Sequence, residues 1–327
     1  MLYWFHYKKV PPRFGAVPTA LRLLPEGNGE STKETIGMDE KQTCLVLEGG
    51  ALRGVYTAGV QGVLHRAGIP VHCFMGTSAG AMNAINFLAG QPERSFQIDH
   101  HFAPDRNFMG LRPLLRERQI FSFRYMFGTV NDTFPFDEKA YTASPIRLVA
   151  VATDCETGQP AYLETCTCSD MMLALQASGS MPLLSYPIYL DGRHYLDGGP
   201  SMAVAYPRAL EEGYHRVVLV LTRQKGYRKS PLSRGTRLAM KLRFRDKPAF
   251  YAMMKDSPRR YNAMMDEIDR LEAQDRLFVI RPSQPVTVSR AEKDQKKLED
   301  LFLLGRKDAE ACLPALGRFL GLEESMA

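Results

Sequence analysis

From residue 43 onward, short apolar runs alternate with glycine-rich turns and amphipathic stretches. The runs at 43–47 and 71–75 each have the length and composition of a buried strand. Each is followed by a glycine-rich turn and then by a stretch typical of a helix, at 55–67 after the first run and at 81–89 after the second. Two strand–turn–helix units in close succession predict a parallel sheet of the α/β class.

Beyond residue 145 the pattern predicts more strands, hairpins and helices, whereas residues 91–145 give no clear assignment. Ser169 is expected to cap a helix that runs to about Ala177, because its hydroxyl can accept a bond from a free N–H at the helix start. Asp191-Gly192 is a two-residue hairpin signal. The other predicted elements are a buried strand at 146–153, hairpins at 153–165 and 188–195, strands at 217–222 and 277–281, and amphipathic helices at 292–304 and 308–320, separated by Gly305.

The first forty residues are rich in proline and glycine, and their apolar positions follow no sustained period. No apolar core of roughly 7–15 residues follows the basic residues near the start, as a secretory signal would require. We therefore expect residues 1–40 to be a poorly ordered N-terminal extension. An alternative is that Met38 is the natural start, because the regular pattern begins directly after it.

The composition is that of an ordinary globular protein, with 45% hydrophobic and 24% charged residues. It excludes a disordered tail, a collagen-like repeat and a coiled coil. No apolar run approaches the roughly 18 residues of a membrane span, so no transmembrane segment is expected. The six cysteines form neither a zinc pattern nor a disulfide framework. We expect no metal site and a reducing, cytoplasmic compartment.

The net charge of +6 is concentrated in one segment, residues 223–260. This segment holds thirteen lysines and arginines against two aspartates, a net charge of +11, which leaves the rest of the chain at −5. Leucines, methionines and aromatic residues lie between the basic ones, a mixture that suits peripheral contact with an anionic membrane. Two amphipathic helices with a solvated basic face would fit equally. Nucleic acid is not expected as a partner, since no recognised motif accompanies the charge.

The strongest candidate for chemistry is the sequence Gly76-Thr77-Ser78-Ala79-Gly80. A nucleophilic serine needs a sharp strand-to-helix turn that lifts its hydroxyl out of the sheet edge, and the flanking glycines let the backbone pass close by. An apolar run precedes the motif, and a helix of small residues follows it, so that the positive end of the helix dipole lies beside the hydroxyl. The competing interpretation is a tight turn in which Ser78 only caps the helix.

A second candidate is the glycine-rich turn 49–54, Gly-Gly-Ala-Leu-Arg-Gly. Backbone N–H groups at such a turn can point at a developing oxyanion without obstruction by side chains. The turn lacks the Gly-Lys-Ser/Thr ending of a P-loop and the glycine spacing of a dinucleotide fingerprint. Arg53 is expected to steady the turn or to face an anionic head group, and an ordinary surface ion pair is the simpler alternative.

A third candidate is Asp197, followed by Gly198 and Gly199. A serine nucleophile needs a base, and an aspartate held by the free N–H groups of a Gly-Gly turn could accept its proton directly. The carboxyl would have to be partly desolvated, because an ordinary aspartate is a poor base near pH 7. A plain turn is the simpler interpretation of Asp-Gly-Gly taken alone. His194 and His215 remain alternative bases.

Taken together and in this order, the three motifs resemble those of the patatin-like phospholipase family, which has a G-G-G-x-R/K-G turn, a G-x-S-x-G elbow and a later D-G-G/A. The resemblance covers about residues 43–207 and includes 150–158 and 177–187 between the motifs. It implies a three-layer α/β/α fold with a central, mostly parallel sheet, and hydrolysis of lipid or phospholipid acyl esters. It also implies a mainly helical C-terminal region, because 208–327 is similar to that part of bacterial patatin-like proteins.

By this resemblance, Ser78 would be the nucleophile and Asp197 the general base of a Ser–Asp dyad that requires no cofactor. The oxyanion hole would be formed by the amides of residues 50–52 and their neighbours, a set that comprises Gly49, Gly50, Ala51, Leu52, Arg53 and Gly54. Ala51 departs from the family pattern, since it replaces the third glycine of the turn. Alanine would be strained by about 1 kcal/mol if that position has a positive φ.

Pattern and resemblance together predict three parts of the chain: the extension 1–40, a catalytic domain at 41–207 and a C-terminal region at 208–327 of unknown role. Two alternatives to an active Ser–Asp hydrolase stay open. Because of Ala51, the protein could be a weak or inactive family member that binds lipid or another partner. A Ser-His-Asp esterase using His215 or His194 is the other alternative.

Overall fold

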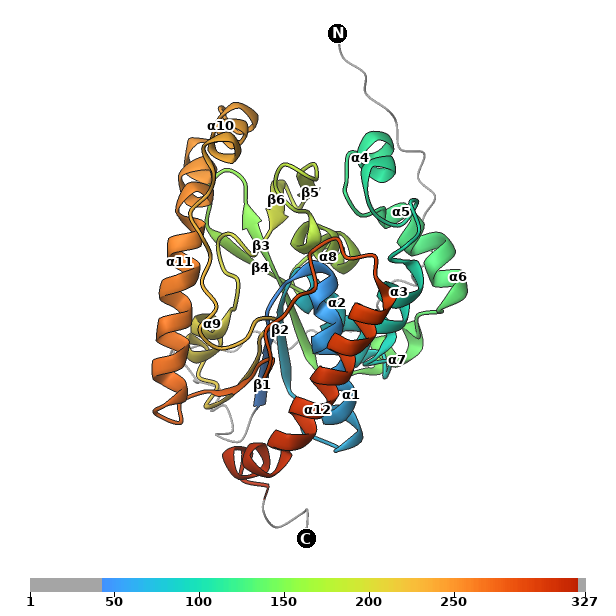
Figure 1. The fold of residues 1–327 in the computed structure, drawn as a ribbon, viewed down its shortest axis with the longest axis vertical. Helices are drawn as coiled ribbons and strands as arrows, with labels where there is room; N and C mark the ends of the chain where they lie inside the picture. The colour runs from blue at the N-terminus through green and yellow to red at the C-terminus, as the bar shows by residue number, and fades with distance from the viewer. Residues whose placement is uncertain (1–42, 323–327) are drawn as a thin grey trace, which may run out of the picture. The chain divides into compact units, whose positions relative to one another are not determined.

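The computed structural model describes residues 43–322, so the expectations for residues 1–40 and for Met38 fall outside the described part of the chain. Its centre is an eight-stranded sheet in the order β5-β6-β3-β2-β1-β7-β8, with β4 paired to β3 (Figure 1). The pairs that join β3, β2, β1, β7 and β8 are parallel, and the pairs of β3 with β4, β3 with β6 and β5 with β6 are antiparallel. The sheet is therefore mostly parallel, as predicted.

The strands and helices follow one another in regular alternation at first and less regularly later. The strands are β1 (Thr43–Leu47), β2 (Cys73–Thr77), β3 (Arg147–Asp154), β4 (Pro160–Glu164), β5 (Ile188–Leu190), β6 (Arg193–Asp197), β7 (Arg216–Val220) and β8 (Phe278–Ile280). The helices are η1 (Ala51–Arg53), α1 (Gly54–Arg66), α2 (Ala79–Leu88), α3 (Arg94–Phe102), α4 (Leu111–Glu117), α5 (Phe123–Tyr125), η2 (Met126–Val130), α6 (Asn131–Thr133), α7 (Glu138–Ala143), α8 (Met171–Gly179), α9 (Tyr206–Glu211), α10 (Arg234–Arg243), α11 (Pro248–Glu272) and α12 (Gln295–Leu320).

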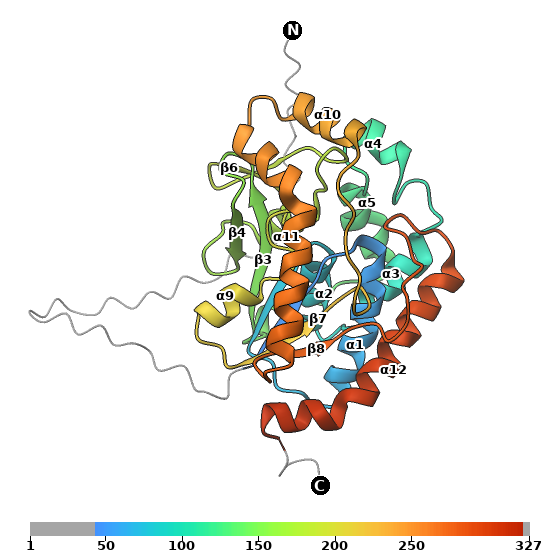
Figure 2. The same ribbon diagram turned by 60° about the vertical axis from the view of Figure 1, so that its left-hand side comes forward.

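Helices cover both faces of the sheet, which gives three layers (Figures 1 and 2). Successive side chains of a strand point to opposite faces, and β1 follows this rule. Leu45 and Leu47 pack into a core with α1, α2, α3 and α12. Cys44 and Val46 pack into a second core with α9 and α11. Strands buried on both faces read as continuous apolar runs, which is why the sequence predicted them. The three-layer α/β/α fold is thus confirmed, and the region after residue 207 is mainly helical.

Gly305 does not separate two helices, so this expectation was wrong. The single helix α12 runs from Gln295 to Leu320 and packs along α1. A Cβ added at Gly305 would lie 2.3 Å from the carbonyl oxygen of Tyr56, and one at Gly59 would lie 2.3 Å from that of Phe302. The glycines are therefore needed for a close approach of the two helix backbones rather than for a helix end.

The cap of α8 was also placed wrongly. The carboxylate of Asp170, not the hydroxyl of Ser169, accepts bonds from the N–H groups of Met172 and Leu173. The N–H of Ser169 instead donates to the Asp191 carboxylate at 3.1 Å. The hairpins at β3–β4 and β5–β6 are confirmed, and Asp191 and Gly192 both have positive φ, as the predicted turn requires. The unassigned stretch 91–145 forms α3 to α7.

The segments after residue 207 contribute to the sheet itself. β7 pairs with β1 along its whole length, and β8 pairs with β7. The loops that leave β7 and β8 therefore emerge at the same edge of the sheet as the loops after β1 and β2. None of the helices within residues 43–322 is both long enough and apolar enough to cross a membrane.

Candidate active site

The three motifs meet at the carboxyl edge of the parallel strands. The glycine-rich turn follows β1, and the G-x-S-x-G motif ends β2 and begins α2. These two strands are adjacent and parallel, so their carboxyl ends lie side by side. Asp197 ends β6, which runs antiparallel to β3 and pairs Asp197 with Ala152 near the carboxyl end of that strand. Such an edge is where open α/β sheets commonly bind ligands.

Ser78 lies on a strained turn between β2 and α2. Its backbone has φ 56° and ψ −122°, and its side chain accepts no capping bond from the helix. The interpretation of Ser78 as a simple helix cap is therefore not supported. Its N–H donates to the Ser178 hydroxyl at 2.8 Å, and that hydroxyl donates to the carbonyl oxygen of Val151 at 2.6 Å. A non-glycine residue persists in such a conformation only where its surroundings hold it.

The glycines of the elbow are required by contact rather than by flexibility. A Cβ added at Gly76 would lie 2.5 Å from backbone atoms of Ala81, and one at Gly80 would lie 2.4 Å from the carbonyl oxygen of Leu47. The first turn of α2 is thus pressed against both neighbouring strands. This contact fixes the height of the Ser78 hydroxyl above the sheet.

Asp197 is buried beside Ser78. Its carboxylate accepts the Gly199 N–H at 2.7 Å, and its own N–H donates to the carbonyl oxygen of Ser180. Burial raises the pKa of this carboxyl above its ordinary value, while the Gly199 N–H bonded to it and the neighbouring Ser78 hydroxyl lower the pKa. A partly desolvated carboxyl in contact with the serine hydroxyl is the arrangement that a direct proton acceptor needs.

Gly198 fixes the turn that holds this carboxyl. A Cβ added there would lie 2.3 Å from the carbonyl oxygen of Val151. The hydroxyl of Thr153 donates to the carbonyl oxygen of Asp197 at 2.8 Å. The Asp-Gly-Gly sequence is therefore packed tightly against β3.

The glycine-rich turn lies directly against the serine elbow. A Cβ added at Gly49 would lie 2.9 Å from the Ser78 Cβ, and one at Gly54 would lie 2.9 Å from the Ala79 Cβ. Within residues 43–322, the N–H groups of residues 49, 50 and 51 have no acceptor. Free N–H groups beside a serine are the donors that an oxyanion requires. Leu52, with a buried side chain, and Arg53 belong to the short helix η1.

Ala51 has φ 50°, so the position does have the left-handed backbone conformation that favours glycine. The alanine is therefore strained by about 1 kcal/mol, and the turn keeps this conformation despite its methyl group. Gly50 has a different constraint, because a Cβ there would lie 2.9 Å from the Thr222 hydroxyl.

The buried residue Glu48 directly precedes this turn and anchors it to later segments of the chain. It was not predicted as a site residue. Its carboxylate accepts the N–H of Thr222 at 2.7 Å and the hydroxyl of Tyr261 at 2.9 Å. The Thr222 hydroxyl also donates to the carbonyl oxygen of Gly49 at 3.0 Å. The one signal in the sequence was a glutamate between a buried strand and Gly49-Gly50. Its partners come from loops and helices more than 170 positions later.

Cationic side chains gather around the same turn. Arg53 is 7% exposed, and Lys229 lies over the ring of Tyr261, its ammonium nitrogen 3.7 Å from the centroid. Burial and the positive charges of Arg223 and Arg290 lower the pKa of Arg53 to about 10. Burial also lowers the pKa of Lys229, to about 8. Lys229, Arg223 and Arg290 come from the loops after β7 and β8.

The two histidines considered as bases contact neither Ser78 nor Asp197. His194 is exposed on β6, with its ring against Tyr189 at 5.1 Å. His215 is exposed and directly precedes β7. Because β7 is parallel to β1, this residue lies at the amino edge of the sheet, opposite the serine.

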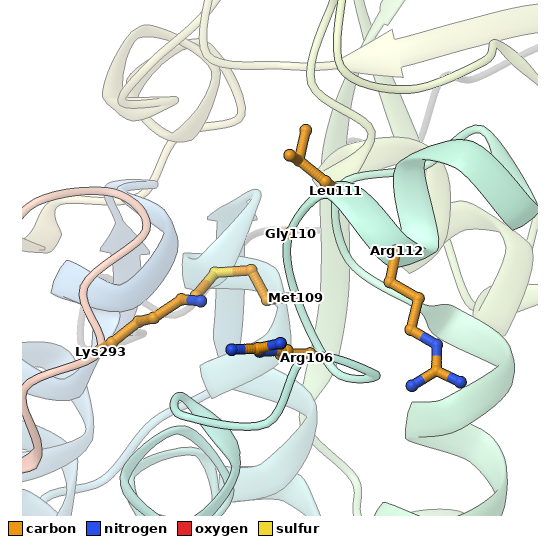
Figure 3. A pocket seen from close by; sticks show the side chains of 6 residues that line it. All are labelled: Arg106, Met109, Gly110, Leu111, Arg112 and Lys293. Carbon is orange, nitrogen blue, oxygen red and sulfur yellow. The ribbon is translucent and has the colours of Figure 1, made fainter.

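A hollow of about 460 Å³ lies apart from these residues, between the start of α4 and the loop before α12. Figure 3 shows Arg106, Met109 and Lys293 converging on it, with Leu111 at its edge and the guanidinium of Arg112 turned away. Neither Ser78 nor Asp197 lines this hollow, so the carboxyl edge of the sheet remains the candidate active site.

The elbow that carries Ser78, the buried Asp197 and the glycine-rich turn thus lie together at the carboxyl edge of the α/β sheet. Residues 45–209, half of the chain, match the family described as "Patatin-like phospholipase". The chain belongs to the patatin-like phospholipase family. Residues 247–321 match a domain of unknown function.

Two known proteins are similar to this chain over a large part of its length. The chain is 26% identical over 192 residues to the uncharacterized protein YjjU of Escherichia coli strain K12, a match that covers 54% of this chain and 51% of YjjU. The chain thus spans about half the length of this curated relative. The crystal structure of VipD from Legionella pneumophila matches with a TM-score of 0.43 and 14% identity, over 91% of this chain and 72% of VipD. This likeness is too loose to carry a functional conclusion.

Proposed function

We propose that the protein is a serine hydrolase that cleaves lipid acyl esters through Ser78 and Asp197. The observation that carries the proposal is the contact between the Ser78 hydroxyl and the buried Asp197 carboxyl at the carboxyl edge of the sheet. Membership of the patatin-like phospholipase family supports a lipid ester as the substrate class. The pairing needs no third residue, because the aspartate faces the serine directly.

The reaction follows from this arrangement. Asp197 accepts the Ser78 proton as the serine oxygen attacks the acyl carbon, and the carbonyl electron pair moves onto the oxygen. The free N–H groups of Gly49, Gly50 and Ala51 stabilise that oxyanion. Collapse of the intermediate expels the alcohol, which takes the proton from Asp197. Water then attacks the acyl-serine, with Asp197 as its base, and Ser78 regains its proton as the fatty acid leaves.

A matched set of variants tests this proposal. Ser78→Ala and Asp197→Asn should each abolish hydrolysis of a p-nitrophenyl ester, while His194→Ala and His215→Ala should keep it. The circular dichroism spectra and unfolding midpoints of the inactive variants should show an intact fold. A Ser78→Ala protein that retains turnover would contradict the mechanism, and a loss at either histidine equal to that of Asp197→Asn would favour a Ser-His-Asp esterase.

The second candidate function is lipid or partner binding by a weak or inactive family member, and the strain at Ala51 is the observation that favours it. A fluorophosphonate probe separates the two. Covalent labelling of wild-type protein, absent in Ser78→Ala, requires an activated serine and therefore supports the hydrolase. No labelling of the folded wild-type protein would support a binding role.

We also propose that the substrate is met at an anionic membrane surface in the cytoplasm. The predicted basic segment 223–260 contains α10, on which Leu238 and Leu242 are 59% and 66% exposed among basic residues. Exposed leucines of α4, Leu111 and Leu115, extend this surface. Apolar residues surrounded by basic ones suit an interface with anionic lipid.

One exposed tyrosine connects the two helices. The guanidiniums of Arg118, at the end of α4, and of Arg243, at the end of α10, both lie 5.0 Å from the ring centroid of Tyr186. In both views α4 and α10 lie at the same end of the sheet (Figures 1 and 2). That end is the carboxyl edge, where Ser78 lies.

A further inference from the structure

We propose that Arg53, Arg223, Lys229 and Arg290 form a subsite that binds an anionic group of the substrate, such as the phosphodiester of a phospholipid, beside the scissile ester. The proposal deepens the hydrolase function above and rests on Ser78 as the nucleophile. The four residues come from the turn after β1 and from the loops after β7 and β8. Three of them therefore belong to the part of the chain that follows the patatin match.

Arg53 is the buried member of the set and has an unused donor. Its side chain is 7% exposed, and within residues 43–322 its Nε–H has no hydrogen-bond partner. A buried N–H donor without a partner is costly, because it has lost its bond to water. The cost is recovered when an anion accepts a bond from this donor, because guanidinium pairs with phosphate and carboxylate in charge-assisted bonds.

Two of the remaining cations are held in place by aromatic rings. Lys229 lies over the Tyr261 ring, and Arg223 lies 4.5 Å from the centroid of Tyr227 while donating to the carbonyl oxygen of Val286 at 2.9 Å. The Tyr261 hydroxyl is itself fixed by Glu48. Rings position a cation without neutralising it, so both side chains keep their charge available for a ligand.

No acid in the described residues neutralises this set. Across residues 43–322, no carboxylate lies within ion-pair distance of any of the four cations. The acids whose charges act on Lys229 are Glu48 and Asp197. Glu48 already accepts hydrogen bonds from Thr222 and Tyr261, and Asp197 is the proposed proton acceptor of Ser78. An excess of positive charge thus remains at the turn.

Lys229 lies near the glycine-rich turn, because it stacks on the ring of Tyr261, whose hydroxyl bonds to Glu48, the residue directly before Gly49. The positive charges of Arg290 and Lys229 both lower the pKa of Asp197. Arg223 directly follows Thr222, which bonds to Glu48 and to the carbonyl oxygen of Gly49, and the charge of Arg290 acts on both Arg53 and Lys229. In a glycerophospholipid the phosphodiester is attached to the carbon next to the ester-bearing carbon at position 2. A cationic group beside the oxyanion turn fits an ester with that neighbour better than a neutral acylglycerol.

Paired substrates test the subsite. One substrate is a monoacylglycerol phosphate, and the other is the monoacylglycerol with the same acyl chain. We measure kcat/KM for both at pH 7, below the concentration at which micelles form, and take the ratio of the charged to the neutral substrate. We expect the wild-type ratio to exceed one, and Lys229→Met and Arg290→Gln each to lower it about tenfold, the loss of one charge-assisted bond. The control Lys307→Gln removes an exposed lysine of α12 and should leave the ratio unchanged. An unchanged ratio in Lys229→Met and Arg290→Gln would overturn the subsite.

A binding measurement separates failure of the subsite from failure of the hydrolase. Decyl phosphate is titrated calorimetrically into the Ser78→Ala protein, with decanol-saturated buffer as the uncharged reference. Saturable binding that weakens about tenfold in Ser78→Ala/Lys229→Met supports the subsite even if no ester is cleaved. Absence of binding while wild-type protein hydrolyses neutral esters overturns the subsite and leaves the hydrolase standing.

Discussion

Gly305 of α12 lies against the carbonyl oxygen of Tyr56 in α1, where a methyl group would have to lie 2.3 Å from that oxygen. The Tyr56 side chain is completely buried, and its hydroxyl donates to the Asp308 carboxylate at 3.0 Å, one turn along α12. The contact therefore combines a close backbone approach with a partly buried polar bond. It joins the helix behind the glycine-rich turn to the last helix of the described chain.

Replacement of this glycine should destabilise the fold. We expect Gly305→Ala to lower the free energy of unfolding by about 2 kcal/mol or more, because rigid backbone faces the new methyl group. The matched control is Gly235→Ala in α10, where the added Cβ meets only the Ser233 hydroxyl at 4.0 Å. This control should raise the free energy of unfolding by about 0.5 kcal/mol. Denaturant unfolding measures both, and equal effects would show that the α1–α12 contact does not need a glycine.

The strain at Ala51 predicts an unequal response of the oxyanion turn to two substitutions. Ala51→Gly relieves about 1 kcal/mol of strain but adds a similar entropic cost, so stability should change by less than about 1 kcal/mol and esterase activity should be kept or raised. Gly50→Ala drives a methyl group toward Thr222 and should lower kcat about a hundredfold. Esterase assays on both variants check this. A lower kcat in Ala51→Gly would show that the alanine is needed.

The cations near Asp197 should set the acid limb of the pH–rate profile. The carboxyl must be ionised to accept the serine proton, so activity falls as the pH drops through its pKa. Because Lys229 and Arg290 lower that pKa, Lys229→Gln and Arg290→Gln should raise it and move the acid limb of kcat/KM to higher pH. The profile for a neutral ester measures this shift directly. A limb that moves to lower pH, or does not move, would contradict the electrostatic role.

The preference for anionic substrates should itself depend on pH. The pKa of Lys229 is lowered to about 8 by burial and by the positive charges of Arg290 and Arg53, although Glu48 and Asp197 raise it. The ammonium is therefore charged at pH 7 and neutral at pH 9. The ratio of kcat/KM for the phosphate substrate to that for the neutral one should fall as the pH rises through about 8.

Lys229→Arg supplies the control for this pH dependence. Arginine keeps its charge throughout this range, so the decline near pH 8 should disappear in the variant. If the ratio declines equally in the wild-type protein and in Lys229→Arg, a group other than Lys229 causes the decline.

Vesicle binding should depend on the exposed leucines of α10. Leu238→Ser/Leu242→Ser should reduce co-sedimentation with vesicles of phosphatidylcholine and phosphatidylglycerol. The burial of each leucine side chain in lipid would stabilise binding by about 1.5–3 kcal/mol. Leu303→Ser is the control, since Leu303 is also exposed but lies on α12. Binding that is indifferent to lipid charge, or to the α10 substitutions, would remove the proposed membrane contact.

The features that were predictable are the ones that depend on local pattern. Thr43–Leu47 was predicted at its true bounds because a buried parallel strand is a continuous apolar run. The elbow at Ser78 was found because its strain demands glycines at fixed positions nearby. Pattern could not say that Ala51 has a positive φ, since alanine allows either sign. Nor could it distinguish Ser169 from Asp170 as a cap, because both side chains can accept the same bonds.

The features that escaped prediction depend on contacts between distant segments. Gly305 was interpreted as a helix end, yet its role is set by Tyr56, about 250 positions earlier. Glu48 was overlooked because its partners, Thr222 and Tyr261, follow all three motifs. A sequence read in short windows cannot pair such residues.

The support of Glu48 by Thr222 and Tyr261 has a consequence for the order of events during synthesis. All three motifs have left the ribosome once residue 199 has emerged. The carboxylate under the oxyanion turn still lacks both partners at that moment, and α1 lacks the helix that covers it. We expect the nascent chain to carry a complete set of motifs but no hydrolytic activity until α11 and α12 have folded onto the sheet.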